Sequence, residues 1–257
     1  MKNIQHHFSK IAHCYRDLRT TDLEPILFIK KKLQKYSNIV AADVGCGAGG
    51  YGLKLSQNLS KKLYLYCIDS NKEMIKQLSS YLNSHNIKTT QTIKASATKI
   101  PLPDNLLDCL FTFNAIHHFK ILEFFNNASR VLKKDGYLFI YTRLRSQNKR
   151  NIWGKYFPLF NQKETRLYEL NELKEILKKC PYLKIESIKF FKYKRVASLD
   201  WLLYQAENYH YSTFCLYEEG EFKSSLDKFK KNLKTQFKDL KDITWFDENI
   251  LLVMRKV

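Results

Sequence analysis

With 257 residues, 44% of them apolar, the chain is long enough to bury one substantial core and is not composed like a disordered protein. The net charge of +19 makes an anionic partner such as RNA a class to consider, although charge alone bears on association and not on fold. No apolar run approaches the roughly twenty residues that span a bilayer, and residues 1–7 lack the apolar stretch of a signal peptide, so we expect a cytoplasmic protein without a membrane span.

The first half of the chain alternates strands and helices. Short apolar runs bounded by polar turns predict the strands, and apolar residues at helical spacing predict the helices between them. This alternation predicts a doubly wound parallel sheet, with Gly136 as a turn or helix-ending residue before the fifth strand. The predicted strands are 39–44, 63–68, 90–95, 107–113 and 137–141, and the predicted helices are 8–15, 22–36, one beginning near Gly50, 71–84 and 121–132.

The pattern changes after the fifth strand. Residues 143–168 are basic and rich in aromatic side chains, and we expect them to be irregular. The rest of the chain predicts helices at 170–179, 197–209 and 219–237, and strands at 183–193 and 249–255.

The six cysteines argue against a metal site. They form no C-x-x-C pair and show no metal-like spacing with histidine. Cys46, Cys67 and Cys109 lie in or beside predicted buried strands, and we expect them to fill apolar space in a reducing compartment.

The run Asp43-Val-Gly-Cys-Gly-Ala-Gly49 is the most informative motif. Its glycines, Gly45, Gly47 and Gly49, follow a predicted buried strand and precede a helix, so the backbone can turn tightly and approach a ligand. Twenty residues later Asp69 ends the second predicted strand, where a carboxylate suits the hydroxyls of a ribose. These features predict a nucleoside site at the carboxyl edge of the sheet.

The spacing D-x-G-x-G-x-G differs from the dinucleotide pattern G-x-G-x-x-G. It resembles motif I of the class I S-adenosylmethionine-dependent methyltransferases, and over about residues 8–142 the chain resembles their ubiquinone-biosynthesis-like (methyltransferase type 11) group. The resemblance implies a Rossmann-like seven-stranded sheet with an antiparallel last strand, a mostly helical lid, and S-adenosyl-L-methionine as cofactor, with S-adenosyl-L-homocysteine as product. It implies a single domain over 1–257, with a cofactor core at about 37–142 and lid and substrate elements at 1–36, 143–168 and 194–248.

The same resemblance implies a set of cofactor-binding residues. Asn114, after the fourth strand, corresponds to a position near the methionine part of the cofactor or the substrate. Ser96 stands where the family most often has an acidic residue that contacts adenine, so its hydroxyl, or the backbone of Ser96 and Ala97, would serve instead. The full set is Asp43, Gly45, Cys46, Gly47, Gly49, Asp69, Ser70, Met74, Ser96, Ala97 and Asn114.

His117 is the candidate catalytic residue, in the run Asn114-Ala-Ile-His-His118. An imidazole titrates near neutrality, so His117 could act as a general base or contact the substrate. The alternative is that His117 and His118 only pack at the start of a helix. The chain lacks the N-P-P-Y signature, which argues against adenine or glutamine as acceptor.

The methyl acceptor is left open among three readings. A small or medium-sized organic acceptor comes first, because the aromatic residues within 194–248 could line a pocket, although they could equally be helix packing. RNA comes second. The runs Ala42-Asp-Val-Gly-Cys-Gly47, Ala115-Ile-His-His-Phe119 and Leu138-Phe-Ile-Tyr-Thr-Arg143 resemble those of tRNA wobble carboxymethyluridine methyltransferases. Residues 143–195 also carry fifteen Lys/Arg against five Glu, which would suit a phosphate backbone. That surplus could equally be an ordinary lysine-rich surface. A cofactor-binding subunit without catalysis comes third.

Overall fold

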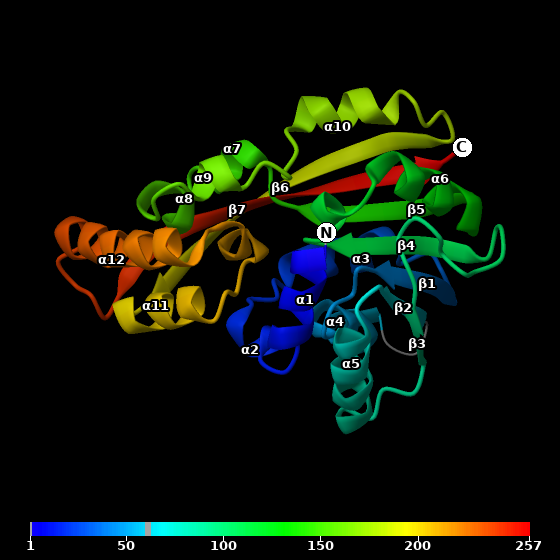
Figure 1. Ribbon diagram of the computed structural model, residues 1–257. Coiled ribbons are helices and arrows are strands. Elements are labelled where there is room, and N and C mark those ends of the chain that lie inside the picture. Colours follow the sequence, from blue (N-terminus) through cyan, green and yellow to red (C-terminus); the bar gives the residue numbers. More distant parts are fainter. Residues whose placement is uncertain (1, 60–62) are drawn as a thin grey trace. The chain divides into compact units, whose positions relative to one another are not determined.

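The computed structural model describes residues 2–59 and 63–257, which fold around a mixed β-sheet (Figure 1). The described residues form seven strands in the order β3-β2-β1-β4-β5-β7-β6. The strands are β1 (Ile39–Val44), β2 (Leu63–Asp69), β3 (Thr90–Lys94), β4 (Leu107–Phe113), β5 (Leu132–Thr142), β6 (Leu183–Ala197) and β7 (Ile243–Lys256).

Helices connect these strands. In chain order they are α1 (Lys2–Ile11), α2 (Tyr15–Leu18), α3 (Glu24–Lys32), α4 (Gly50–Leu59), α5 (Lys72–Ser84), η2 (Ile116–His118), α6 (Ile121–Val131), α7 (Arg145–Asn148), α8 (Ile152–Tyr156), α9 (Phe160–Lys163), α10 (Leu170–Leu177), α11 (Leu199–Glu207), η3 (Ser212–Leu216) and α12 (Glu219–Gln236).

The strand order reverses between β1 and β4, which lie side by side in parallel. Right-handed crossovers place α4 and α5 on one face of the sheet and α6 on the other. In doubly wound sheets a ligand crevice opens at such a reversal, outside the carboxyl ends of the strands. Here the carboxyl end of β1 leads into the glycine motif and that of β4 leads to Asn114, so the fold brings these two predicted site segments together.

The predicted fold class is confirmed. Strands β1, β2, β3, β4 and β5 pair in parallel, and β7 pairs with β5 antiparallel, from Tyr137 opposite Arg255 to Thr142 opposite Ile250. The core strand β4 is buried along nearly its whole length, which explains its continuous apolar sequence.

Three expectations about local structure were wrong. Gly136 does not end a helix or form a turn between elements, because it lies inside β5, where the register against β4 shifts between Leu107 and Cys109. Residues 143–168 are not irregular throughout, since they contain α7, α8 and α9. The last strand begins at Ile243, six residues before its expected start.

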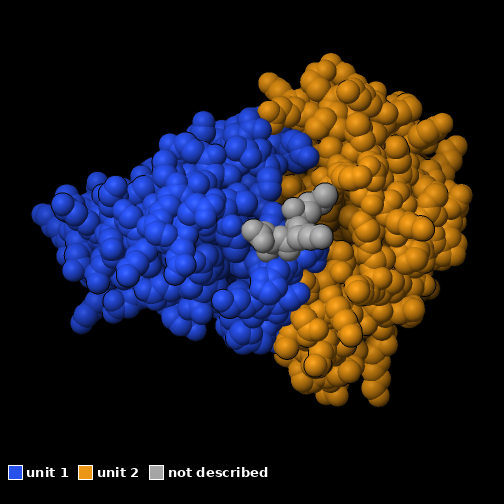
Figure 2. All heavy atoms as spheres, in the orientation of Figure 1, with its two compact units in different colours: residues 1–19, 143–169, 190–249 blue, residues 20–142, 170–189, 250–257 orange. Residues whose placement is uncertain are grey.

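The described chain divides into two compact units, coloured separately in Figure 2. Unit 2 contains residues 20–142, 170–189 and 250–257, and therefore most of the sheet. Unit 1 contains residues 1–19, 143–169 and 190–249. Its core is built largely from aromatic side chains: Trp153, Phe157, Phe160, Phe214, Tyr217, Phe222 and Phe229.

None of the helices in the described residues is both long and apolar enough to cross a bilayer.

Candidate cofactor site

The glycine motif forms a tight turn at the end of β1. Gly45 has φ +76, and a Cβ placed on it would come 2.6 Å from the Cβ of Ala115 and 2.9 Å from the Phe119 ring. Only glycine adopts this positive φ without strain, and only glycine lacks the Cβ that would clash with Ala115 and Phe119. The N–H groups of Gly45 and Cys46 donate to the Ile68 carbonyl at 2.8 and 3.2 Å, so the turn is tied to the end of β2.

Asp69 braces the same turn from β2. Its Oδ2 accepts a 2.9 Å hydrogen bond from the Gly47 N–H, and its Oδ1 accepts one of 2.8 Å from the Asn71 N–H. Burial raises the pKa of Asp69, and the hydrogen bonds from the N–H groups of Asn71 and Gly47 offset part of that rise. The carbonyl of Asp69 accepts from the Ala95 N–H at 3.0 Å, which places Ser96 next to it along the sheet edge.

Asp43 has a buried carboxyl group with no ion-pair partner among the residues that the structure describes. Neither of its oxygens has a hydrogen-bond partner among the described residues, and the side chain is only 1% exposed. Burial, and then the charge of Asp69, raise the pKa of Asp43 to about 8. A buried carboxylate is costly unless a donor or cation meets it, so Asp43 is suited to receive a positively charged ligand group.

Three further predicted residues differ in their surroundings. Cys46 is buried, and burial first and the thiol of Cys67 second raise its pKa. Met74 is buried in the first turn of α5, where Asn71 caps the helix by accepting from the N–H groups of Glu73 and Met74 at 3.0 and 3.1 Å. Ser70 is exposed.

The segment expected to contact adenine has its own local bonds. The exposed Ser96 hydroxyl lies 2.9 Å from the Thr98 hydroxyl and accepts from the Thr98 N–H at 3.2 Å, while Ala97 is buried. A hydroxyl oxygen has two lone pairs, so this turn does not exhaust the hydrogen-bonding capacity of Ser96.

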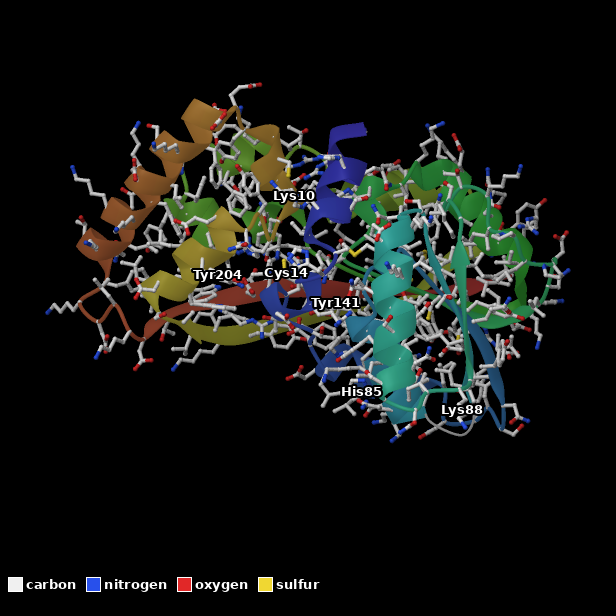
Figure 3. All side chains as sticks on the ribbon, turned by 60° about the horizontal axis from the view of Figure 1, so that its bottom comes forward. Lys10, Cys14, His85, Lys88, Tyr141 and Tyr204 are labelled. Atoms are coloured by element: carbon white, nitrogen blue, oxygen red, sulfur yellow. The ribbon has the colours of Figure 1, made fainter. Side chains whose placement is uncertain are left out.

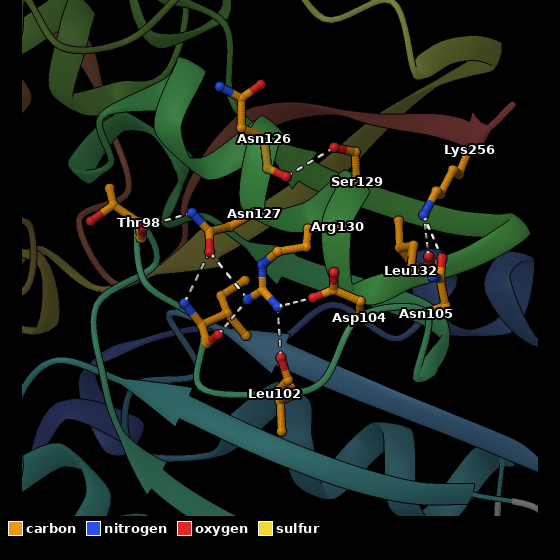
Figure 4. Close-up of polar contacts among 11 residues, drawn as sticks. Thr98, Leu102, Asp104, Asn105, Asn126, Asn127, Ser129, Arg130, Leu132 and Lys256 are labelled. Carbon is orange, nitrogen blue, oxygen red and sulfur yellow. Dashed lines mark hydrogen bonds and ion pairs between the residues drawn. The ribbon is translucent and has the colours of Figure 1, made fainter.

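Arg130 and Asn127, both on α6, fasten the loop that follows Ser96 (Figure 4). The two terminal nitrogens of Arg130 donate to the carbonyls of Leu102 and Ile100, at 2.8 and 2.7 Å, and the amide of Asn127 donates to the carbonyl of Thr98 at 2.6 Å. Sequence reasoning missed this clamp. The sequence shows an Asn and an Arg three residues apart on one helix face, but this spacing does not indicate which loop they bind.

Asn114 stands at the end of β4 in a left-handed conformation, φ 52, and its N–H donates to the Tyr141 carbonyl at 2.7 Å. His117 follows in η2, half-buried, with its ring 4.0 Å from that of His118. The structure thus places Asn114 at the carboxyl edge and His117 one short turn beyond it. The catalytic role of His117 stays a prediction.

Sequence reasoning also missed a polar network beside this edge. Tyr141, labelled in Figure 3, is fully buried in β5 and donates from its hydroxyl to Asp22. The N–H of Asp22 donates to the Tyr51 hydroxyl at 3.3 Å, and the Tyr51 ring stacks on Phe113 at 4.1 Å. The residues before α3 are therefore held to the start of α4 and to the ends of β4 and β5.

Most arginines of residues 143–195 form ion pairs with carboxylates inside unit 1. Arg143 and Arg195 both pair with Asp247, at 3.2 and 3.3 Å, Arg150 pairs with Glu248, and Arg166 pairs with Glu164. Three aromatic residues of the same segment belong to the core of unit 1 and are therefore not exposed for stacking on bases: Trp153, Phe157 and Phe160. The predicted RNA surface is therefore not supported.

The aromatic set of 194–248 divides into two groups. Phe214 and Tyr217 are buried in the core of unit 1, and Tyr209 and Tyr211 pack against it. Trp201 and Tyr204 are instead exposed, at 39% and 47%, on α11. Helix packing therefore accounts for the burial of Tyr209, Tyr211, Phe214 and Tyr217, but it does not account for the exposed rings of Trp201 and Tyr204.

Residues 42–140 match a protein family described as a methyltransferase domain. The chain is similar to the uncharacterised methyltransferase YcgJ of Bacillus subtilis, with 28% identity over 131 residues, which are 50% of this chain. It spans about half the length of that curated relative, at 51%.

Solved structures share the fold. The YcgJ crystal structure aligns with a TM-score of 0.63 at 17% identity, covering 91% of this chain and 98% of that one. A protein of Anabaena variabilis, described as a methyltransferase from an antibiotic biosynthesis pathway, gives 0.68 at 20%, again covering 91% and 98%. The [4+2]-cyclase SpnF gives 0.57 at 16%, covering 91% and 80%. At these identities the likeness establishes the architecture alone.

The glycine turn with its two aspartates, the reversed strand order and the family match agree with one another. Residues 42–140 of this chain therefore match a methyltransferase domain and form the parallel part of a sheet with the methyltransferase-like strand order β3-β2-β1-β4-β5.

Proposed function

We propose that the chain is a methyltransferase that moves a methyl group from S-adenosyl-L-methionine to a small or medium-sized organic acceptor. The fold by itself leaves the reaction open, because the similar SpnF structure is a cyclase. The match of residues 42–140 to a methyltransferase domain supports methyl transfer.

The single observation that carries the cofactor assignment is the unpaired carboxylate of Asp43. S-adenosylmethionine has an α-ammonium group, which would supply both the missing hydrogen-bond donors and the counter-charge. A dinucleotide would instead bring a pyrophosphate, which has no donor for the oxygens of Asp43 and whose negative charge would raise the pKa of Asp43 further. The charge of the site therefore fits an amino-acid-bearing nucleoside.

The other predicted residues fit around such a ligand. Gly45, Gly47 and Gly49 would let the backbone pass close beneath its amino-acid part, and Cys46 would lie in the same turn. Asp69, next to Ser70, would accept from the ribose hydroxyls, because each of its oxygens keeps a lone pair beyond the bond it already makes. Ser96 and Ala97 would contact the edge of the adenine ring, and Met74 would pack on the face of that ring. Asn114 would contact the methionine part of the cofactor.

The cofactor supplies an electrophilic methyl group on a positively charged sulfur. The protein has to hold the acceptor in line with that methyl group and exclude water. A general base is needed only where the attacking atom must lose a proton, and His117 is the candidate for that step.

The cofactor arm of the test is calorimetry. S-adenosylmethionine and S-adenosylhomocysteine should bind the purified chain, and Asp43→Asn should weaken both by about tenfold or more, since a charge-assisted hydrogen bond is lost. Asp227→Asn, which removes an exposed carboxylate on α12, is the matched control. Absence of binding, or NAD binding instead, would overturn the cofactor assignment.

The acceptor arm follows labelled methyl transfer into fractionated cell extract, with and without nuclease. Label in a nuclease-resistant small-molecule fraction supports the proposal. Label that disappears with nuclease would transfer the assignment to RNA. Tight cofactor binding with no transfer to any fraction would favour a non-catalytic subunit.

A further inference from the structure

A network of side-chain contacts in unit 1 joins three arginines through one tyrosine and one aspartate. Arg143 donates from Nη1 to the Tyr211 hydroxyl at 3.2 Å, and its Nη2 lies 3.2 Å from Oδ1 of Asp247. Arg195 pairs with the other oxygen of that carboxylate, with its Nε 3.3 Å from Oδ2. The guanidinium carbon of Arg19 lies 4.4 Å from the centroid of the Tyr211 ring. The three cations therefore belong to one continuous network.

This network carries more positive than negative charge. Arg143 and Arg195 share the single carboxylate of Asp247. The carboxylate of the next residue, Glu248, pairs with Arg150. Within the network three guanidinium groups thus meet one carboxylate, and arginine stays protonated, so the excess is about two positive charges.

The excess charge is only partly open to solvent. The side chains of Arg143, Arg195 and Asp247 are 11%, 19% and 14% exposed, so salt and water screen their charges less than at an open surface. Burial first, and then the charge of Arg19, lower the pKa of His210. A water molecule could accept hydrogen bonds from these arginines, but a neutral molecule would leave the excess in place. An anion would accept the same bonds and also balance the charge.

The network is held in place by neighbouring contacts. Gln205 on α11 donates from Nε2 to the Leu18 carbonyl at 2.8 Å, which ties the end of α2, and with it Arg19, to that helix. The Tyr211 ring packs edge-on against the buried ring of Trp153, with centroids 6.4 Å apart. Side chains that are already ordered lose less conformational entropy when a ligand binds.

We propose that Arg19, Arg143 and Arg195 form a binding site for the phosphate group of a small phosphate monoester. Guanidinium groups match the geometry of phosphate oxygens. A phosphate monoester carries a charge of about −1.5 to −2 at neutral pH, which balances the excess. A carboxylate, a sulfate ester or a phosphodiester, each with one negative charge, would balance only half of it. This site goes beyond methyl transfer, and its test uses no cofactor.

The experiment titrates phenyl phosphate into the full-length protein by calorimetry, at neutral pH and physiological salt. Phenyl phosphate should bind at one saturable site, and phenyl sulfate, which has a similar shape and one charge fewer, should bind about tenfold more weakly. Arg195→Gln should weaken the binding of phenyl phosphate by about tenfold or more, since a charge-assisted contact is lost.

Lys163→Gln is the matched control for Arg195→Gln. Both side chains belong to unit 1, pair with a carboxylate and lie over a tyrosine ring: Lys163 with Glu221 and Tyr217, and Arg195 with Asp247 and Tyr193. The two variants therefore remove the same charge and the same kinds of contact, but the Lys163 pair lies outside the arginine network. Lys163→Gln should change the affinity by less than about twofold.

A second variant guards against loss of folding in Arg195→Gln. Arg19→Gln removes a half-buried cation from a different part of the chain and should weaken the binding of phenyl phosphate by about tenfold, whereas Lys228→Gln, on an exposed side chain of α12, should not. Thermal unfolding of each variant identifies any that is destabilised. Equal affinities of Arg195→Gln and Lys163→Gln would overturn the proposal. So would equal binding of phenyl sulfate, tighter binding of inorganic phosphate or of a short single-stranded RNA than of phenyl phosphate, or no saturable binding.

Discussion

The Tyr141 hydroxyl donates a 2.7 Å hydrogen bond to Oδ2 of Asp22, joining two buried side chains that lie 119 positions apart in the chain. The backbone of Tyr141 also accepts from the Asn114 N–H, at 2.7 Å. One residue of β5 therefore ties the segment before α3 to the end of β4, at the edge where the glycine turn lies.

Removing that hydroxyl should be costly. Tyr141→Phe leaves a buried carboxylate oxygen of Asp22 without this donor, so the free energy of unfolding should fall by about 1–3 kcal/mol. Urea denaturation measures it. Tyr64→Phe, on an exposed ring of β2, is the control and should change stability by less than about 0.5 kcal/mol. Equal losses in the two variants would contradict a specific role for the Tyr141–Asp22 bond.

The carboxyl group of Asp43 should make stability depend on pH. Its pKa is raised from 3.8 to about 8, so between these values the folded state holds a proton that the unfolded state has lost. Stability contributed by this group is therefore present below its unfolded pKa and is lost as pH rises towards 8. Relative to Asp43→Asn, the wild type should lose up to about 1.4 kcal/mol of unfolding free energy per pH unit. Urea denaturation at several pH values between 5 and 7.5 measures the difference, and a constant difference would refute the assignment.

The glycine turn should not tolerate a side chain. Gly45→Ala forces a Cβ to 2.6 Å from the Ala115 Cβ at φ +76, and should cost about 2–4 kcal/mol through overpacking and left-handed strain. Gly220 offers the opposite case, since a Cβ there meets nothing within 4 Å in the first turn of α12. Gly220→Ala should be neutral or stabilise by up to about 1 kcal/mol. Thermal unfolding compares the two, and a mild Gly45→Ala would show that the turn can relax.

Arg130 should matter to the nucleoside site through the loop that it holds. Arg130→Met frees the carbonyls of Ile100 and Leu102, so adenosine-containing ligands should bind about tenfold more weakly if this loop shapes the adenine pocket. Arg130 also pairs with Asp104, at 2.7 Å. Arg255→Met is the control, because Arg255 likewise contacts an aspartate side chain and a carbonyl, both of Asp135 in β5. Calorimetry with S-adenosylhomocysteine measures both, and equal affinities would separate the loop from the site.

The predicted contact with the ribose hydroxyls depends on Asp69. Asp69→Ala removes two hydrogen bonds to the backbone as well as the expected acceptors for ribose, so its effect mixes stability with binding. Asp69→Asn keeps one acceptor oxygen and separates the two. Cofactor affinity should fall by about tenfold in Asp69→Asn, while the free energy of unfolding changes by less than in Asp69→Ala. Unchanged calorimetric affinity in both variants would rule out a ribose contact.

The sequence determined the parts of this protein that rest on local pattern. The buried strands, the glycine turn after β1 and Asp69 at the end of β2 follow from apolar periodicity and from the backbone freedom of glycine, and the order of elements was enough to predict the sheet. Roles of the site residues, His117 above all, remain predictions, because they depend on ligands.

Tertiary structure alone decided which distant groups meet. The pairs Asp22 with Tyr141 and Arg130 with Leu102 could not be predicted from spacing along the chain, because contacts between elements depend on how packed faces align. The short helices α8 and α9 likewise depend on the burial of Trp153 and Phe160 in the aromatic core of unit 1, since isolated helices of four or five residues are unstable in water. Local periodicity fixes a segment's own conformation, whereas burial and charge compensation across the fold fix its partners.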